Sequence, residues 1–163
     1  MSVEIESGIS LQEAAEFVWC EADLLDDLAY REWLKLWTSD ALYIVPIDRN
    51  AEDHAAGLNV LYDNQEMREA RVKRLLSGFS MSSAPPARTV RTVSRFRILE
   101  RGDDSLTLRA AQHLVEYKYE RTRVLAADVT YRLVRTAEGL ALDRKVVRLI
   151  NSDDALFGIG YLL

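Results

Sequence analysis

Apolar residues recur at helical spacing in the first half of the chain. Ser10 and Glu13 have the spacing of a capping box, in which two side chains satisfy backbone donors at a helix start. We predict a helix behind this box, a second short helix over residues 31–37, and a third over residues 64–76 that ends near Gly78. The apolar stripe of the first helix comprises Leu11, Ala14, Ala15, Val18, Ala22, Leu25, Leu28 and Ala29.

The second half of the chain changes to the alternating pattern of strands. The turns between these strands, at residues 101–104 and 137–139, carry the glycine and acidic residues that hairpins favour, so an antiparallel meander is expected. A sequence with helices first and strands last favours an α+β fold, with helices packed on one face of the sheet and a single domain over residues 1–163. The expected strands are 42–45, which Pro46 ends, 89–100, 105–121, 123–136 and 139–151, with a loop over 47–59 and an extended connector over 80–87.

Neither face of the predicted sheet is cleanly polar. Alternation places Leu125, Val129, Tyr131 and Leu133 on one face of the 123–136 strand. In the 89–100 strand, Val90, Phe96 and Ile98 are expected on one face, and Arg91, Val93, Arg95, Arg97 and Leu99 on the other. A mixture of arginine and apolar residues is typical of an interaction surface, whereas a solvated sheet face is the alternative.

Composition excludes several classes of partner. The 163 residues carry a net charge of −5, which gives no overall field to attract nucleic acid or an anionic membrane. No apolar run approaches the length of about 18 residues that a membrane span needs. A single cysteine, Cys20, cannot form an internal disulfide, so we expect a cytoplasmic protein.

The inventory of ligands and bases is small. A Rieske cluster needs two cysteines and two histidines, and the sequence has one cysteine. The two histidines, His54 in the polar loop and His113 in a strand, could join a mononuclear iron site only if they converged with an acid, and no short-spaced ligand motif supports this. We therefore expect no metal and no catalytic residue on this chain, with His54 solvated.

Two segments together carry a family resemblance. Residues 21–34 read as an acidic helix that ends in Glu32, Trp33 and Leu34, and residues 88–94 read Arg-Thr-Val-Arg-Thr-Val-Ser. With residues 37–46 and 143–151, they resemble the small (beta) subunit of aromatic-ring-hydroxylating (Rieske non-heme iron) dioxygenases. The resemblance implies a cone-shaped fold of the nuclear-transport-factor-2-like (NTF2-like), SnoaL-like or cystatin-like group, with a curved, mixed and mostly antiparallel sheet packed against N-terminal helices.

The same resemblance implies a role in assembly. In that family a homotrimer of small subunits forms a base beneath three large (alpha) subunits, and the large subunits carry the Rieske [2Fe–2S] cluster and the mononuclear iron. This chain would then be a non-catalytic structural subunit without cofactors of its own. The residues expected at subunit interfaces are Arg88, Arg91, Arg95, Arg97, Phe157 and Tyr161. The arginines near residue 88 could instead pair with the acidic first helix.

An enzymatic alternative keeps the same fold. Related cone folds house dehydratases, isomerases and cyclases, which act on small molecules through a base in the barrel mouth. Isomerases of this type place an aspartate before the proline that ends the first strand, whereas this chain has Val45 there. The cavity residues for this alternative are Tyr30, Asp40, Tyr43, His113 and Tyr131.

Overall fold

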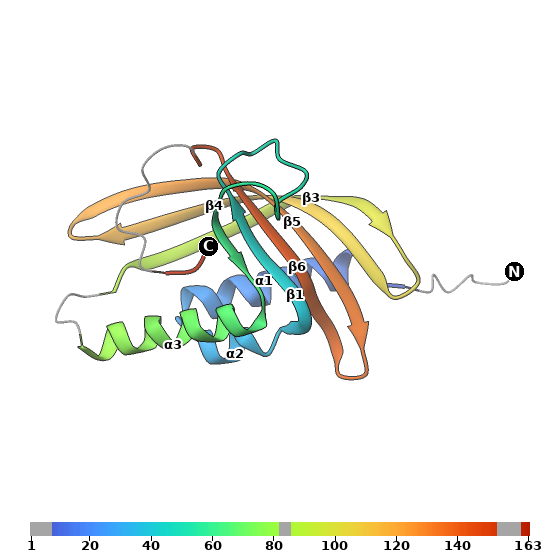
Figure 1. Ribbon diagram of the computed structural model, residues 1–163, viewed down its shortest axis with the longest axis horizontal. Helices are drawn as coiled ribbons and strands as arrows, with labels where there is room; N and C mark the ends of the chain where they lie inside the picture. Colours follow the sequence, from blue (N-terminus) through green and yellow to red (C-terminus); the bar gives the residue numbers. More distant parts are fainter. Residues whose placement is uncertain (1–7, 82–85, 153–160) are drawn as a thin grey trace, which may run out of the picture.

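The computed structural model describes residues 8–81, 86–152 and 161–163 (Figure 1). Its elements are α1 (Leu11–Asp26), α2 (Tyr30–Leu34), β1 (Trp37–Pro46), β2 (Asn59–Asp63), α3 (Gln65–Met81), β3 (Arg88–Arg101), β4 (Ser105–Lys118), β5 (Arg121–Thr136) and β6 (Gly139–Leu149). The α+β class is confirmed. None of the helices within these ranges is long and apolar enough to cross a membrane.

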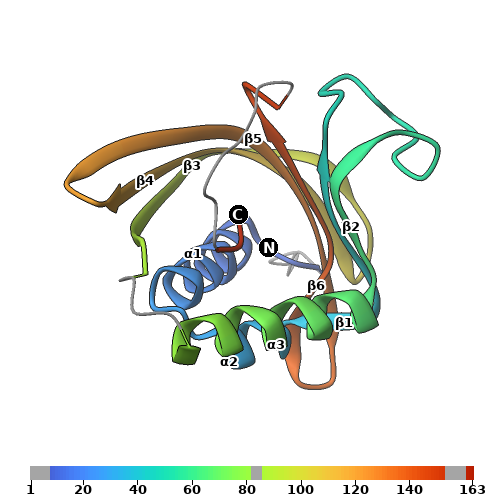
Figure 2. The same ribbon diagram turned by 60° about the vertical axis from the view of Figure 1, so that its left-hand side comes forward.

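The strands form one curved sheet in the order β2-β1-β6-β5-β4-β3. Strands β3 to β6 are the predicted antiparallel meander, and β1 joins it by pairing in parallel with β6. The sheet is therefore mixed and mostly antiparallel. Figure 2 shows it curling around α1, with α2 and α3 below its open side. The result is a cone with an inner face toward the helices and an outer face away from them.

The middle of the predicted stripe packs against the inner face of the sheet, whereas Leu11 is exposed and Leu28 and Ala29 lie beyond the end of α1. The capping box forms as expected, because Ser10 accepts from the Glu13 backbone and Glu13 accepts from the Ser10 backbone. Ala14, Val18 and Leu25 are buried in the main core. Full burial of a valine or leucine side chain stabilises a fold by about 1.5–3 kcal/mol, so this stripe fixes α1 on the sheet.

The boundaries in the first half differ from the sequence predictions. The second helix ends at Leu34, and Trp37 begins β1 by pairing with Leu142 of β6. Its ring packs edge-on against Trp33, with ring centroids 5.1 Å apart. Pro46 belongs to β1, at a shift in the pairing register with β2. Strand β2 lies where the sequence suggested only the end of a loop, since pairing with β1 overrides its polar ends.

Helix α3 is longer than predicted. Asn64 caps its start by accepting from the Met67 backbone at 3.0 Å, but the helix continues through Gly78 to Met81. A glycine in a helix costs about 1 kcal/mol relative to alanine, which the other residues of the helix outweigh. From its first turns, buried Arg68 donates to the carbonyl of Ala41 at 2.6 Å. That contact ties α3 to β1.

A bulge in β3 changes which side chains share a face. Arg95 has φ 57, and the register with β4 shifts between Ser94 and Arg97. The extra residue reverses the alternation, so Val90 is exposed while Phe96 packs against the core. The prediction that Val90 and Phe96 share a face is therefore wrong. The face predicted for Leu125, Val129, Tyr131 and Leu133 is confirmed by their burial in the core.

The hairpin between β4 and β5 turns at two residues with positive φ. Tyr119 has φ 52 and Glu120 has φ 60, values of a turn that favours asparagine and glycine. Neither residue is one of those types, and each side chain raises the energy of this conformation. The sequence therefore gave no signal for the turn.

We predict that replacing this turn by Tyr119→Asn with Glu120→Gly stabilises the protein. Removing strain at two positions should raise the unfolding free energy by about 1 kcal/mol, and the melting temperature by about 2–4 °C for a domain of this size. Thermal unfolding followed by circular dichroism measures the shift. The control Tyr119→Ala with Glu120→Ala keeps both Cβ atoms and should give no rise; an equal rise in the control would contradict the explanation.

Candidate functional site

A buried ion pair lies inside the cone. Lys145 of β6 donates to both carboxylate oxygens of Glu21 on α1, at 2.9 and 2.8 Å, and both side chains are almost fully buried. The indole of Trp33 donates to the same carboxylate at 3.0 Å. Burial lowers the pKa of the Lys145 ammonium, and the Glu21 carboxylate opposes that shift. The pair joins the first helix to the middle of the sheet.

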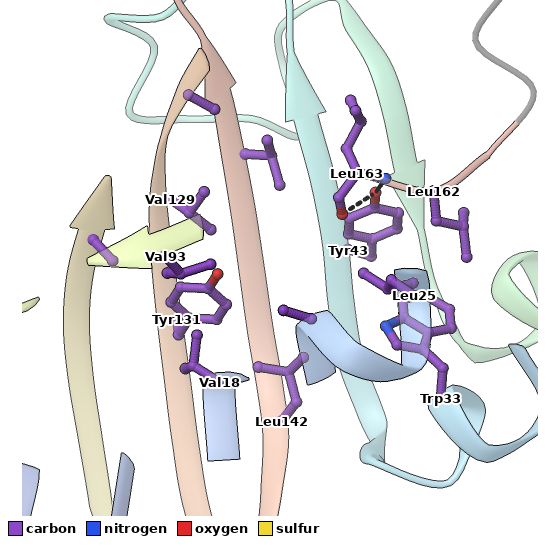
Figure 3. Close-up of a cluster of buried hydrophobic side chains, with 14 of the residues drawn as sticks. Val18, Leu25, Trp33, Tyr43, Val93, Val129, Tyr131, Leu142, Leu162 and Leu163 are labelled. Atoms are coloured by element: carbon purple, nitrogen blue, oxygen red, sulfur yellow. Dashed lines mark hydrogen bonds between the residues drawn. The ribbon is translucent and has the colours of Figure 1, made fainter. Parts of the chain in front are cut away.

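Residues 161–163, here called the C-terminal segment, fill the space beside this pair. Lys145 donates to the main-chain oxygen of Leu163 at 2.9 Å, and the Tyr43 hydroxyl donates to the same oxygen at 3.0 Å. The Leu163 N–H in turn donates to the Tyr43 hydroxyl at 2.9 Å. Figure 3 shows Leu162 and Leu163 beside Tyr43, and Figures 1 and 2 both place the segment between sheet and helices. The segment is therefore part of the interior.

Arg91 also lies in the interior. Its guanidinium pairs with Asp26 of α1 and donates to the main-chain oxygen of Leu162, while its backbone N–H donates to Asp26 at 2.9 Å. The side chain is almost fully buried. Arg91 was expected at a subunit interface, and within this chain it pairs with the acidic first helix, the alternative considered for these arginines.

Tyr161 closes a second polar cluster. Its hydroxyl donates to Glu116 of β4, which also accepts from Arg123 of β5 at 2.7 Å. Burial alone would raise the pKa of Glu116, but the hydrogen bonds from Arg123 and Tyr161 lower it below the ordinary value. Burial raises the pKa of the Tyr161 phenol. Tyr161 was expected at a subunit interface, and in the single chain it is buried in its own fold.

The five cavity candidates are not brought together. Tyr30, Tyr43 and Tyr131 lie in the interior, each at most 1% exposed. His113 is exposed on the outer face of β4, and Asp40 is exposed near the start of β1. Asp40 instead borders a shallow groove of about 440 Å³ beside the start of α3, lined by Ser39, Asn64, Gln65, Glu66 and Glu69.

The interior offers little for acid–base chemistry. The carboxylates of Glu21, Asp26 and Glu116 are already engaged by Lys145, Arg91 and Arg123. Burial raises the pKa of Tyr43 and of Tyr131, so both phenols stay protonated at neutral pH. Within the described residues, no group of three or more histidine, cysteine, aspartate or glutamate side chains could hold a metal ion. One cysteine in the whole sequence does not fit a Rieske cluster.

On the outer face of the sheet, no segment among the described residues covers β3, β4 and β5. Val90, Val115 and Val124 lie opposite one another across these strands and are 65%, 40% and 59% exposed. We call this set the valine row. Arg88 lies opposite Tyr117 next to it, and Arg95 and Arg97 are exposed further along β3. Phe157 lies outside the described residues.

The other half of the outer face is covered by the β1–β2 loop. Ile44 and Val146 pair across β1 and β6 and are buried, although alternation places them opposite the main core. His54 of this loop is only 4% exposed, so the expectation that it is solvated is wrong. Burial lowers the pKa of His54, and the charges of Arg148 and Arg144 lower it further.

Comparison with known proteins assigns the family. The description "Ring hydroxylating beta subunit" matches residues 20–153. The chain belongs to this family. It is 30% identical over 147 residues to the 2-halobenzoate 1,2-dioxygenase small subunit of Burkholderia cepacia, a match that covers 87% of this chain and 89% of that protein. The resemblance seen in the sequence is thereby confirmed.

Solved structures confirm the fold of this beta subunit. The beta subunit of the benzoate 1,2-dioxygenase from Burkholderia mallei superposes with a TM-score of 0.81 at 24% identity, over 99% of this chain and 100% of that chain. A Novosphingobium aromaticivorans structure assigned by name to the scytalone dehydratases gives 0.64 at 10% identity, over 85% and 83% of the two chains. The NTF2-like cone is therefore shared with a protein named for a different chemistry.

The sequence reading of the beta subunit missed its buried charges. Glu21 was noted only as the start of the acidic segment 21–34, and Lys145 only as part of the segment 143–151. A signal was present, because Glu21 continues the spacing of Ala14, Val18 and Leu25 along the buried stripe of α1. Lys145 similarly holds a core-facing position two residues before buried Val147 in β6.

We predict that the contributions of Glu21 and Lys145 to the unfolding free energy are coupled. Lys145→Met alone leaves Glu21 buried without its partner and should lower the unfolding free energy by about 3–5 kcal/mol. The double variant Glu21→Met with Lys145→Met should recover at least about 2 kcal/mol of that loss, since apolar replacement of a buried pair is often neutral. Urea unfolding of the single and double variants measures this coupling. Losses that simply add would contradict it.

We predict that acid destabilises the β1–β2 loop through His54. Its folded pKa is depressed below the ordinary 6.5, so on acidification the unfolded chain takes up the proton first. Stability is therefore complete above 6.5 and falls as the pH drops below it. Unfolding free energies between about pH 7.5 and about pH 5.5 should show a shallower slope for His54→Asn than for the unmodified chain. The exposed-site control His113→Asn should keep the original slope.

Proposed function

We propose that this chain is the non-catalytic structural subunit of an aromatic-ring-hydroxylating dioxygenase. Three copies would form a trimeric base that supports iron-containing large subunits. The observation that carries the proposal is the filled interior, where a substrate-binding member of this fold would need room and a free base. The family assignment and the small-subunit relative agree with this role.

The filled interior separates this proposal from a lyase or isomerase. Leu162 and Leu163 occupy the cone and are held there by Arg91, Lys145 and Tyr43. The alternative reading placed His113 as its base, and that residue points to the outer face. These positions favour a subunit whose interior serves its own stability.

The bare half of the outer face is the surface that we assign to assembly. A row of exposed valines on a sheet is apolar surface that association would bury, and neighbouring arginine and tyrosine are residue types enriched at interfaces. Arg88, Arg95 and Arg97 are retained as interface candidates beside the valine row, and Phe157 stays a sequence-based expectation. The proposed occupant is another copy of this chain.

The cofactors would belong to the partner. One cysteine and two histidines cannot build a Rieske [2Fe–2S] cluster together with a mononuclear iron site, so both groups are expected on the large subunit. This chain's contribution is then to hold large subunits in a fixed arrangement. We place the assembly in the cytoplasm, where a chain with a single cysteine needs no oxidising compartment.

Affinity purification tests the proposal directly. The tagged chain would be isolated from its native cells grown on an aromatic carbon source, and the complex analysed by mass, iron content and visible absorbance. A larger co-purifying polypeptide with iron and Rieske-type absorbance is the expected result. A metal-free assembly without any larger partner would reject the subunit role and return attention to the lyase or isomerase alternative.

We predict that Val124→Glu disrupts self-association. A charge at the β5 end of the valine row would be buried without a partner in the trimer, which costs several kcal/mol at an interface. Light scattering after size exclusion should show a trimer for the unmodified chain and a monomer of 18.6 kDa for the variant. The matched control is Val60→Glu, which is 48% exposed on β2 at the opposite edge of the sheet. A trimer that survives Val124→Glu would remove this surface from the interface.

A further inference from the structure

The C-terminal segment is bound as a ligand would be bound. Its residues belong to no helix or strand, yet they lie buried among four strands of the cone. Main-chain oxygens of Leu162 and Leu163 accept from Arg91 of β3 and Lys145 of β6. The side chains of Tyr43 on β1 and Glu116 on β4 bind the backbone of Leu163 and the hydroxyl of Tyr161.

The groups that bind this segment are held in place without it. Lys145 is fixed by Glu21, which Trp33 also binds. Arg91 is fixed by Asp26 and by the Thr89 hydroxyl, to which it donates at 3.1 Å. These contacts come from the helices and strands alone. The donors therefore form a preorganised site, which lowers the entropy cost of binding any occupant.

The walls and charges of the site define its occupant. Figure 3 shows Leu162 and Leu163 beside Leu25, Trp33 and Tyr43, which provide an apolar and aromatic wall. Because the site's two cations already have carboxylate partners, the occupant supplies oxygen acceptors rather than a missing counter-charge. A suitable ligand is an apolar acyl compound with a carbonyl-type oxygen, either an amide or a carboxylate.

A second observation points to unused binding capacity. The Tyr131 hydroxyl is buried and has no hydrogen-bond partner in the part of the chain that the structure describes. Its ring lies near the same ammonium, with Lys145 Nζ 5.8 Å from the ring centroid. A buried hydroxyl without a partner costs about 1–3 kcal/mol. An occupant with one more polar atom than the C-terminal segment could satisfy it.

We propose that the interior of the cone is a binding site for an apolar acyl compound, and that residues 161–163 occupy it as an intramolecular competitor. The site does not depend on the subunit role, because its contacts lie within one chain. An occupant that belongs to the same chain competes at an effective concentration well above that of a dilute external ligand. An external ligand therefore binds the intact chain weakly and a chain with a weakened segment more strongly.

The test uses the full-length chain with Leu162→Ala and Leu163→Ala, which removes most of the segment's apolar contacts. The probe is the peptide N-acetyl-Tyr-Leu-Leu-amide, and the readout is the melting temperature as the peptide is titrated. We expect a saturable rise for the variant and a much smaller one for the intact chain. The same peptide as a free acid decides whether the site prefers an amide or a carboxylate.

Two controls make the result specific. N-acetyl-Tyr-Glu-Glu-amide has no apolar side chains for the wall and should give no rise. Adding Glu21→Met and Lys145→Met to the variant removes a charge-assisted donor and should weaken peptide binding about tenfold or more. A cooperative melt for the variant with no saturable response to either leucine peptide would overturn the proposal.

A milder variant covers the case in which the double alanine chain does not fold. Leu163→Ala alone keeps the Leu162 contact and the main-chain oxygens, and it is titrated in the same way. If the double variant is unfolded, it is also refolded with and without the peptide. Recovery of folded protein with the leucine peptide supports the site, and no response from either chain rejects it.

Discussion

The ion pair between Lys145 and Glu21 is the interaction on which the interior depends. Two charges removed from water are tolerated only when their remaining hydrogen-bonding capacity is satisfied. The Trp33 indole donates a further hydrogen bond to the carboxylate, and the Leu163 main-chain oxygen accepts one from the ammonium. The helices, the sheet and the C-terminal segment therefore meet at this ion pair. Closing the cone brings the two charges together, and the C-terminal segment then supplies one further acceptor for the ammonium.

The two faces of the sheet differ in how they are covered. Among the residues that the structure describes, the inner face packs against the helices and the C-terminal segment. The outer face is covered over β1 and β6 by the β1–β2 loop and bare over β3 to β5. A fold that is shared with a protein named for dehydratase chemistry has, in this chain, a filled interior and exposed apolar residues on its outer face.

Periodicity predicted the parts of this fold that local pattern controls. The capping box, the α1 stripe and the meander follow from spacing along one segment, and all of them formed. What failed depended on partners distant in sequence. Strand β2 exists because β1 lies beside it. The bulge at Arg95 reverses the faces of the residues that follow it in β3, and a strict alternating pattern does not predict a bulge.

The candidate site was harder to predict than the fold. Tyr30, Tyr43 and Tyr131 were predicted as cavity residues and do lie in the interior. The buried charges of Glu21 and Lys145 beside them were not predicted. A lone lysine or glutamate in a sequence reads as surface, because burial of a charge is rare without a partner. Only the sheet register and the helix position bring Glu21 and Lys145 together, 124 residues apart.

The parallel pairing of β1 with β6 also sets the order in which the protein can be completed. Thr38 of β1 bonds Asp143 of β6, 105 residues further along the chain. The helices and β1 therefore leave the ribosome long before the strand that they need, with their apolar faces exposed. Contacts of such long separation slow folding and favour aggregation of the nascent chain. The second half, by contrast, can form its hairpins as it is made and serve as the template onto which the first half closes.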